Sequence, residues 1–429
     1  MRFQLSIKRD KIFINVRTHA ISITLNTFTV LTFDKEGRLI WAYLDGYTFR
    51  RSFDNRVIEK YRGSENGQRY RIRKELDEKE KRIFLDNVYS GIRLIYEAIK
   101  KGEGNINFPH NVSSNYIEEV EKALSKVLTL NYDKLEKEKR KFLSIYKPVS
   151  ILPPDQYLTL VLQVTEGCWW NRCTFCDFYR DRKFKVKNDE EIIKHIKEVR
   201  EFLGEGIWLR KSIFLADANA LAIPEERFLK VLDIVNQEFP IISEDLEGPD
   251  LSKWKSEHPL HFSGIYSFLD GFIGGRRSTE YYRELKRRNL KRVYVGLESG
   301  SNKLLNFLQK PNNAEEALEV VRTIKEAGIN VGVIVMIGIG GEDYFEEHVK
   351  ETVKVINSMR LGKGDFIYLS EFVGHPELEY SIDASKLEIK ALSQDRIVEQ
   401  IDSIRRGLDF TDPENPPKIT IYDIMEFIY

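Results

Sequence analysis

The sequence is poor in cysteine, with 3 in 429 residues. This scarcity excludes a disulfide-stabilised scaffold, which needs several pairs of thiols spread along the chain. The chain also has no excess of charge of either sign, since Lys plus Arg and Asp plus Glu number 67 each and the formal net charge is zero. The balance argues against a globally basic nucleic-acid binder and against an acidic disordered chain.

Long apolar runs are absent as well. No stretch approaches the roughly 18 residues of a membrane span, and the first ten residues lack the apolar core of a secretory signal. The 42% of hydrophobic residues suffice for a folded core, and 429 residues exceed one average domain. We expect a cytoplasmic globular protein of two or three units, without a membrane partner.

The three cysteines, Cys168, Cys173 and Cys176, stand together in one short segment. Thiols grouped in an otherwise thiol-free chain predict a metal centre. A structural zinc site needs four ligands, and an electron-carrying iron–sulfur cluster uses four thiolates. Three thiolates would leave one iron of a cubane without a protein ligand, so that a small molecule could coordinate and react there. The count therefore favours chemistry over a scaffold.

Two other interpretations use the same thiols and remain open. A zinc site would take its fourth ligand from a histidine, and the chain has His19, His110, His195, His258, His261, His348 and His375. The nearest in sequence, His195, lies in an amphipathic helical run, where a packing or surface role is expected. A plain ferredoxin-like carrier would lack its fourth cysteine.

The cysteine segment resembles the cluster loop of the radical S-adenosylmethionine (radical SAM) superfamily, in which three and then two residues separate the cysteines. The second gap holds Thr174 and Phe175, and the family places an aromatic ring there, close to the cofactor's adenine. The first gap has four residues, 169–172, which predicts a longer loop around the same cluster. Residues 173–178 are similar to the oxygen-independent coproporphyrinogen oxidase branch. The resemblance implies a 4Fe–4S cluster and S-adenosyl-L-methionine as cofactors.

Short apolar runs alternate with amphipathic segments from about residue 158, as in repeated strand–helix units. Six strands are predicted, at 158–165, 212–216, 262–269, 292–296, 330–337 and 366–370. Helix starts are indicated by Asn188 with Glu191, by Pro224, and by Asn313 with Glu316, and Gly328 marks a helix end. The fold expected from the pattern and the resemblance is α/β, a partial (βα)6 radical SAM barrel.

Such barrels place their chemistry at the carboxyl ends of the strands. The resemblance implies that Phe175 and Phe178 pack near the adenosyl group. Strand two ends in residues 215–220, where Asp217 and Asn219 occupy the position of the family's methionine-amine motif. Strand four ends in 295–301, similar to a family cofactor motif that nominates Glu298 and Ser299 for the ribose or amino group. Strand five ends in 337–342, where Gly338 and Gly341 are expected to line the adenine.

The remaining chain divides around the barrel, which we expect over 151–372. Residues 1–150 predict an α+β domain with a hairpin over 28–44 and helical spacing at 79–99 and 115–127. Residues 373–429 predict a C-terminal helical extension. The segment 50–74 is rich in Lys and Arg, and its interpretations are a solvated face, which we favour, or an RNA-binding surface.

The predicted function is reductive cleavage of S-adenosylmethionine to a 5′-deoxyadenosyl radical that acts on an unidentified substrate, small or macromolecular. An electron donor such as ferredoxin or flavodoxin is then needed. No cysteines remain for a second cluster or a methyl-carrying thiol, and no cobalamin-binding motif is present, which disfavours those subclasses. The alternatives are an RNA-modifying radical SAM enzyme docking through 50–74 and a non-catalytic metal or cluster-binding protein.

Overall fold

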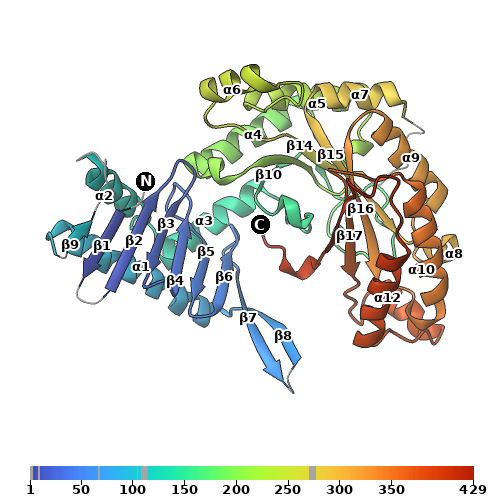
Figure 1. Ribbon diagram of the computed structural model, residues 1–429, viewed down its shortest axis with the longest axis horizontal. Coiled ribbons are helices and arrows are strands. Elements are labelled where there is room, and N and C mark those ends of the chain that lie inside the picture. The colour runs from blue at the N-terminus through green and yellow to red at the C-terminus, as the bar shows by residue number, and fades with distance from the viewer. Residues whose placement is uncertain (1–2, 8–9, 66–67, 104, 108–114, 270–276) are drawn as a thin grey trace. The chain divides into compact units, whose positions relative to one another are not determined.

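A computed structural model of the chain describes residues 3–7, 10–65, 68–103, 105–107, 115–269 and 277–429 (Figure 1). It contains two compact units. One comprises residues 1–149, 196–210 and 428–429, and the other comprises residues 150–195 and 211–427. Residues 373–427 thus group with the predicted barrel, and the chain first passes from one unit to the other at residue 150.

The first unit is a nine-stranded sheet in which all neighbouring strands are antiparallel, in the order β8-β7-β6-β5-β4-β3-β2-β1-β9. Its strands are β1 (Phe3–Ile7), β2 (Asp10–Val16), β3 (Ile21–Leu25), β4 (Thr29–Phe33), β5 (Leu39–Leu44), β6 (Tyr47–Arg51), β7 (Val57–Glu65), β8 (Gln68–Glu75) and β9 (Asn105–Asn107). Its helices are α1 (Glu78–Lys100), α2 (Asn115–Val127) and α3 (Tyr132–Ile145). The predicted hairpin over 28–44 is confirmed as β4 and β5.

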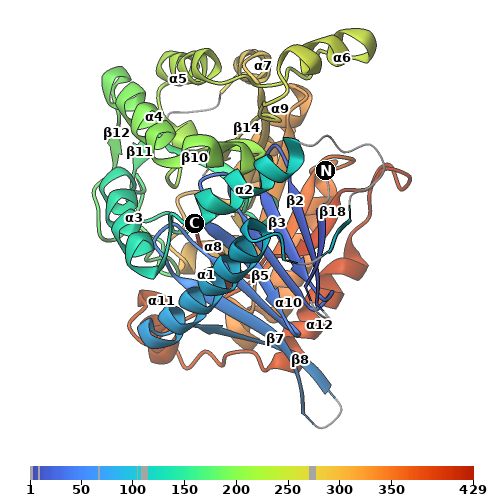
Figure 2. The same cartoon turned by 90° about the vertical axis from the view of Figure 1, so that its left-hand side faces the viewer.

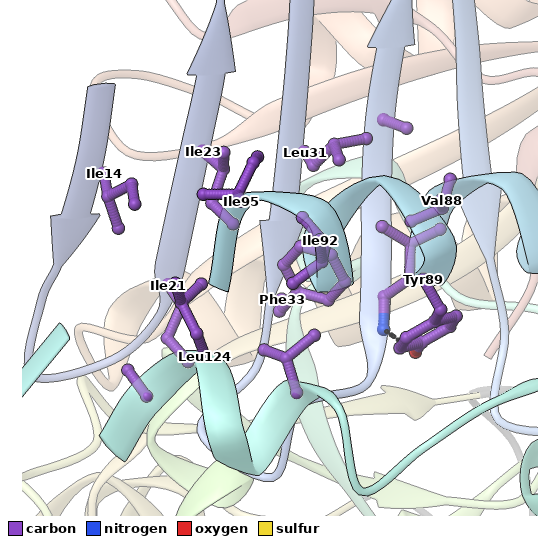
Figure 3. Close-up of a cluster of buried hydrophobic side chains, with 14 of the residues drawn as sticks. Ile14, Ile21, Ile23, Leu31, Phe33, Val88, Tyr89, Ile92, Ile95 and Leu124 are labelled. Carbon is purple, nitrogen blue, oxygen red and sulfur yellow. Dashed lines mark hydrogen bonds between the residues drawn. The ribbon is translucent and has the colours of Figure 1, made fainter. Parts of the chain in front are cut away.

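Alternation of side chains along the strands gives this sheet one apolar face. Helices α1 and α2 lie against that face in Figure 2. Figure 3 shows Ile23, Leu31 and Phe33 of the sheet pointing toward Ile92 and other apolar side chains of α1. Leu124 of α2 closes the same core. The amphipathic helices form because each buries its apolar stripe on the sheet.

The second unit is built on a seven-stranded parallel sheet whose strand order follows the sequence. Its strands are β10 (Thr159–Gln163), β13 (Ser212–Ala216), β14 (Ile265–Leu269), β15 (Leu290–Glu298), β16 (Asn330–Ile337), β17 (Phe366–Glu371) and β18 (Lys418–Ile421). A separate pair is formed by β11 (Thr165–Glu166) and β12 (Lys185–Val186). A parallel sheet wound in chain order is the partial-barrel arrangement, and the predicted α/β class is confirmed.

Helices fill the connections of this sheet, and α7, α9 and α10 lie along its outer side in Figure 1. The helices are α4 (Asp189–Leu203, whose second half groups with the first unit), α5 (Glu225–Glu238), α6 (Gly248–Glu257), α7 (Thr279–Arg287), α8 (Asn302–Phe307), α9 (Ala314–Glu326), α10 (Gly341–Ser358), α11 (Glu379–Lys386) and α12 (Gln394–Gly407). Short 3-10 turns are η1 (Pro154–Gln156), η2 (Gly204–Leu209), η3 (Ala220–Ala222) and η4 (Ile424–Glu426). Among the described residues, none of the helices is long and apolar enough to cross a bilayer.

The six predicted strands are confirmed within a few residues, and both predicted capping boxes are present, at Asn188 with Glu191 and at Asn313 with Glu316. The C-terminal extension predicted over residues 373–429 includes helices and a strand. It contains α11 and α12, but it also supplies β18, which pairs with β17 as a seventh parallel strand. Residues 418–421 alternate polar and apolar, but a run of four is too short to predict a strand, and the open edge of β17 decides their conformation.

Replacement of Ile92 by alanine tests the core of the first unit. Ile92 is fully buried, so we expect Ile92→Ala to lower the free energy of unfolding of this unit by about 2–5 kcal/mol. The matched control is Ile83→Ala on the same helix, whose side chain is 53% exposed and should cost less than about 1 kcal/mol. Urea denaturation followed by circular dichroism measures both, and equal losses would contradict the assigned core.

Candidate functional site

A short ladder closes the base of the cysteine segment, residues 167–184, which we call the cysteine loop. In β11 and β12, Thr165 pairs with Val186 and Glu166 with Lys185, just beyond the carboxyl end of β10. The Asp217 carboxylate accepts hydrogen bonds from the Gly167 amide at 3.0 Å and from Gln163 Nε2 at 2.7 Å. Both ends of the cysteine loop are therefore held at the end of the first barrel strand.

The four-residue first gap of the loop turns back at Asn171, which has a left-handed φ of 48°. Asparagine tolerates this region better than most residues because its short polar side chain bonds locally. The Asn171 amide nitrogen lies 3.4 Å from Cys168 Sγ, and Asn171 Nδ2 donates to the Tyr179 carbonyl at 3.0 Å. This turn absorbs the extra residue and brings the chain back toward Cys173.

Two distant segments hold the middle of the loop. Thr174 N donates to the Leu308 carbonyl at 3.1 Å, and the Thr174 carbonyl accepts from Tyr380 N at 2.9 Å. Trp170 Nε1 donates to the Gln309 carbonyl at 2.8 Å. The loop therefore lies between the residues that follow α8 and the start of α11. Its position depends on contacts more than a hundred residues away in sequence.

A cavity of about 460 Å³ opens beside the loop. Its wall includes all three cysteines together with Phe175, Phe178 and Glu298 of the predicted site. The rest is mainly apolar and comes from the carboxyl ends of the barrel strands and from the C-terminal segment, with Phe268, Leu269, Ile334, Met336, Phe372, Leu378, Ile424 and Met425. A mainly apolar cavity with a few polar groups is typical of small-molecule sites.

Glu298 and Lys310 form a buried ion pair in this cavity. Lys310 Nζ lies 3.3 Å from Glu298 Oε1, and the side chains are 4% and 10% exposed. Glu298 ends β15 with a left-handed φ of 60°. A Cβ at Gly296 would lie 2.3 Å from Glu298 Oε1, so only glycine leaves room for the carboxylate. Among the described residues that line this cavity, Lys310 is the only Lys or Arg.

Ser299 lies behind Glu298 and does not line the cavity. Its Oγ is 2.8 Å from His348 Nδ1, and it accepts from Ser301 N at 3.0 Å. Burial lowers the pKa of His348 to about 4, so the ring that shares this hydrogen bond with the serine hydroxyl is neutral at pH 7. These contacts fix the turn that follows the strained Glu298.

The other predicted residues lie outside the lining of the cavity. Asp217 supports the loop through Gly167, and burial raises its pKa, although the hydrogen bonds from Gln163 and Gly167 act in the opposite direction. Asn219 is fully buried next to η3. Gly338 donates its amide to Gln400 Oε1 at 2.7 Å, and Gly341 begins α10. The glycine turn after β16 thus contacts α12.

Sequence reasoning missed two polar features of the cavity. Lys310 stands in a loop without a motif, and one lysine among 67 basic residues carries no pattern. His375, considered only as a zinc ligand, lies with its Nε2 2.9 Å from the Asp177 carboxylate and lines the cavity beside the loop. Only the folded chain reveals either pairing.

The thiols fit a cluster better than a single ion. The three free cysteines share one cavity, yet in the described chain no three His, Cys, Asp or Glu side chains converge to hold one metal ion. A structural zinc site needs four ligands, whereas a cubane takes one thiolate per iron and can leave one iron to a small molecule. His195 instead accepts from Gln163 N at 3.1 Å, and burial lowers its pKa to about 3.

Comparison with known proteins gives an independent indication of the family that this chain resembles. Residues 267–356, from β14 to α10, match the family model of the Radical SAM superfamily. A putative methylthiotransferase of Methanocaldococcus jannaschii is 21% identical over 55% of this chain and 47% of its own length. A tRNA-2-methylthio-N(6)-dimethylallyladenosine synthase of Desulforamulus reducens is 24% identical over 51% and 42%. The chain spans about half the length of these curated relatives.

Among solved structures, coproporphyrinogen III oxidase from Escherichia coli is similar over 62% of this chain and 55% of its own, with 10% identity and a TM-score of 0.38. The cysteine loop and the parallel sheet agree with the match of residues 267–356 to the Radical SAM superfamily. Members of the superfamily use a 4Fe–4S cluster and S-adenosylmethionine, and these are the cofactors that the cysteine loop fits.

Asn171 provides a test of the loop geometry. Asn171→Ala loses the hydrogen bond to Tyr179 and adds a left-handed penalty of about 1–2 kcal/mol. Asn171→Gly loses only the side-chain bond, since glycine adopts this φ freely. After anaerobic reconstitution we expect iron per chain to fall in the order wild type, glycine variant, alanine variant. Equal iron in all three would show that the turn does not hold the loop.

Proposed function

We propose that this protein is a radical SAM enzyme that reductively cleaves S-adenosylmethionine and uses the resulting 5′-deoxyadenosyl radical on a substrate yet to be identified. The observation that carries the proposal is that the chain's three thiols line one cavity at the carboxyl ends of parallel strands, together with a buried ion pair. Three thiolates leave a cubane with one iron open to a small chelating ligand. That open iron is the condition for this chemistry.

When bound, the cluster and S-adenosylmethionine supply the electron transfer and the carbon–sulfur bond cleavage. The protein's residues bind and orient the cofactors and the substrate, and they exclude water from the site. Cys168, Cys173 and Cys176 hold the iron, while Phe175 and Phe178 give an apolar wall to the adenosyl group.

The ion pair supplies the polar end of the proposed cofactor site. Lys310 offers a cation to the cofactor's carboxylate, and Glu298 offers an acceptor to its amino group or ribose. Both groups are desolvated, so their hydrogen bonds with a charged ligand are stronger than in water. A zwitterionic ligand can replace each partner of the pair with a group of the same charge. Its ammonium group takes the place of Lys310 beside Glu298, and its carboxylate takes the place of Glu298 beside Lys310.

Supporting roles fall to the predicted residues outside the cavity wall. We assign Asp217 and Asn219 to the fixing of the strand end behind the cysteine loop. Ser299 holds the turn after Glu298, and Gly338 with Gly341 shapes the turn after β16. These residues do not line the cavity, and they act by positioning the residues that do.

RNA modification is a second candidate because several relatives are named as tRNA-modifying enzymes. The basic segment 50–74 gives it limited support. Arg51 of this segment is buried and donates to the Leu39 carbonyl at 2.7 Å, so it belongs neither to a solvated face nor to an RNA-binding surface. The side chains of Arg69 and Arg71 lie outside the described residues. RNA binding that is lost with rising salt and with Arg73→Ala would support this candidate.

Cysteine replacement tests the main proposal. Cys168→Ala, Cys173→Ala and Cys176→Ala should each lose most cluster iron and all cleavage of S-adenosylmethionine, because each removes one of three ligands. Iron analysis and chromatographic detection of 5′-deoxyadenosine measure the two effects, with exposed Asp181→Ala of the same loop as control. Retained cleavage in a cysteine variant, or one zinc per wild-type chain without cleavage, would refute the proposal.

The ion pair can be tested with S-adenosylhomocysteine, which binds without being cleaved. Lys310→Met and Glu298→Gln should each weaken its affinity by about tenfold, equivalent to about 1.4 kcal/mol. Calorimetry on cluster-loaded protein measures this, with exposed Lys303→Met as control. The single change at Lys310 leaves a buried carboxylate unpaired, so the double variant should recover thermal stability without recovering affinity. Unchanged affinity in both single variants would remove the pair from the cofactor site.

A further inference from the structure

The outer side of the cysteine loop carries three cations beside the metal-ligating thiols, and none of them lines the cavity. We propose that these residues, Arg172, Arg180 and Lys183, with Trp170, form the docking surface for an acidic one-electron donor protein. We call them the cationic patch. This inference rests on the proposed function, because only a cluster that must be reduced needs such a partner.

The patch is built from the loop itself. Arg180 donates to the Cys173 carbonyl at 3.0 Å and to the Cys176 carbonyl at 3.3 Å. The guanidinium of Arg172, the residue before Cys173, lies 5.2 Å from the Trp170 ring centroid. A cation is thus placed against the backbone of two of the ligating residues.

Lys183 brings a third cation to the remaining ligand. A Cβ on Gly167 would lie 3.1 Å from the Lys183 carbonyl, so Lys183 lies against the residue that precedes Cys168. The side chains of Arg172, Arg180 and Lys183 are exposed. The backbone at or next to each of the three cysteines therefore contacts or adjoins a residue with an exposed cationic side chain.

Charge pairing leaves this surface positive. Four cationic residues of the loop, Arg172, Arg180, Arg182 and Lys183, stand against two acidic ones. Of these, Asp181 pairs with Arg182 at 2.8 Å, and Asp177 contacts His375 Nε2 at 2.9 Å. In the part of the chain that the structure describes, Arg172 and Lys183 have no carboxylate within ion-pair distance. Arg180 has one, Glu379, at 3.4 Å, in an exposed pair that contributes little energy.

A surface with more positive than negative charge selects an anionic partner and speeds its encounter. The reaction at the patch is a single transfer: the reduced donor gives up one electron, the oxidised cluster gains it, and no covalent bond or proton changes place. Small and weakly bound interfaces are typical of such encounters. A donor on the patch also leaves the cavity open for the cofactor and substrate, because the two surfaces use different side chains.

The test compares a protein donor with a chemical one. The double variant Arg172→Glu/Lys183→Glu should bind a low-potential acidic flavodoxin at least about tenfold more weakly and lose a similar factor in flavodoxin-driven cleavage at low salt. Cleavage driven by dithionite and iron per chain should be unchanged. The control is Lys350→Glu on α10, whose side chain is 80% exposed.

The outcomes separate this inference from the proposed function. Flavodoxin affinity and flavodoxin-driven rate that both survive the charge reversal overturn the docking surface. An equal fall in the rate of dithionite-driven cleavage also overturns the docking surface, because the charges would then act on the cluster itself. Absence of dithionite-driven cleavage in the wild type refutes the proposed function instead, and the affinity measurement still decides whether the patch binds the acidic protein.

Discussion

The candidate site depends on how the cysteine loop is tied down. A loop of eighteen residues would lose much conformational entropy on ordering, and here that cost is offset by backbone hydrogen bonds at both ends and in the middle. The β11–β12 ladder closes its base, Asp217 holds Gly167, and Leu308 and Tyr380 bind Thr174 from opposite neighbours. Without these ties the three thiols would not share one cavity, and no cluster could be held in place.

The rest of the cavity follows from the parallel sheet. Strands wound in chain order carry their carboxyl ends to one edge, so residues from β14 to β17 meet there although they are separated by many residues in sequence. Glu298 is turned inward by a left-handed backbone at the end of β15. Gly296 and Lys310 then make its burial possible, one by leaving space and the other by pairing the charge.

In the proposed function, the inner and outer sides of the cysteine loop have different roles. The inner side presents thiols and aromatic rings to the cavity, and the outer side presents the cationic patch to solvent. Burial raises the pKa of the Cys176 thiol to about 12, so iron must displace its proton on binding. A site that is apolar within and positive outside favours an anionic centre that receives electrons from an acidic partner.

The sequence by itself determined the elements whose signals are local. Periodicity and caps located the six barrel strands and the helices that begin at Asn188 and Asn313, and three grouped thiols indicated the metal centre. Tertiary structure alone decided the rest. Strand β18 forms only because β17 offers an open edge, and Lys310 meets Glu298 across a turn without a motif. The glycine turn after β16 contacts α12 instead of lining the cavity, because Gln400 reaches it from sixty-two residues away. Such pairings are set by chain topology and packing, which a pattern of neighbouring residues does not encode.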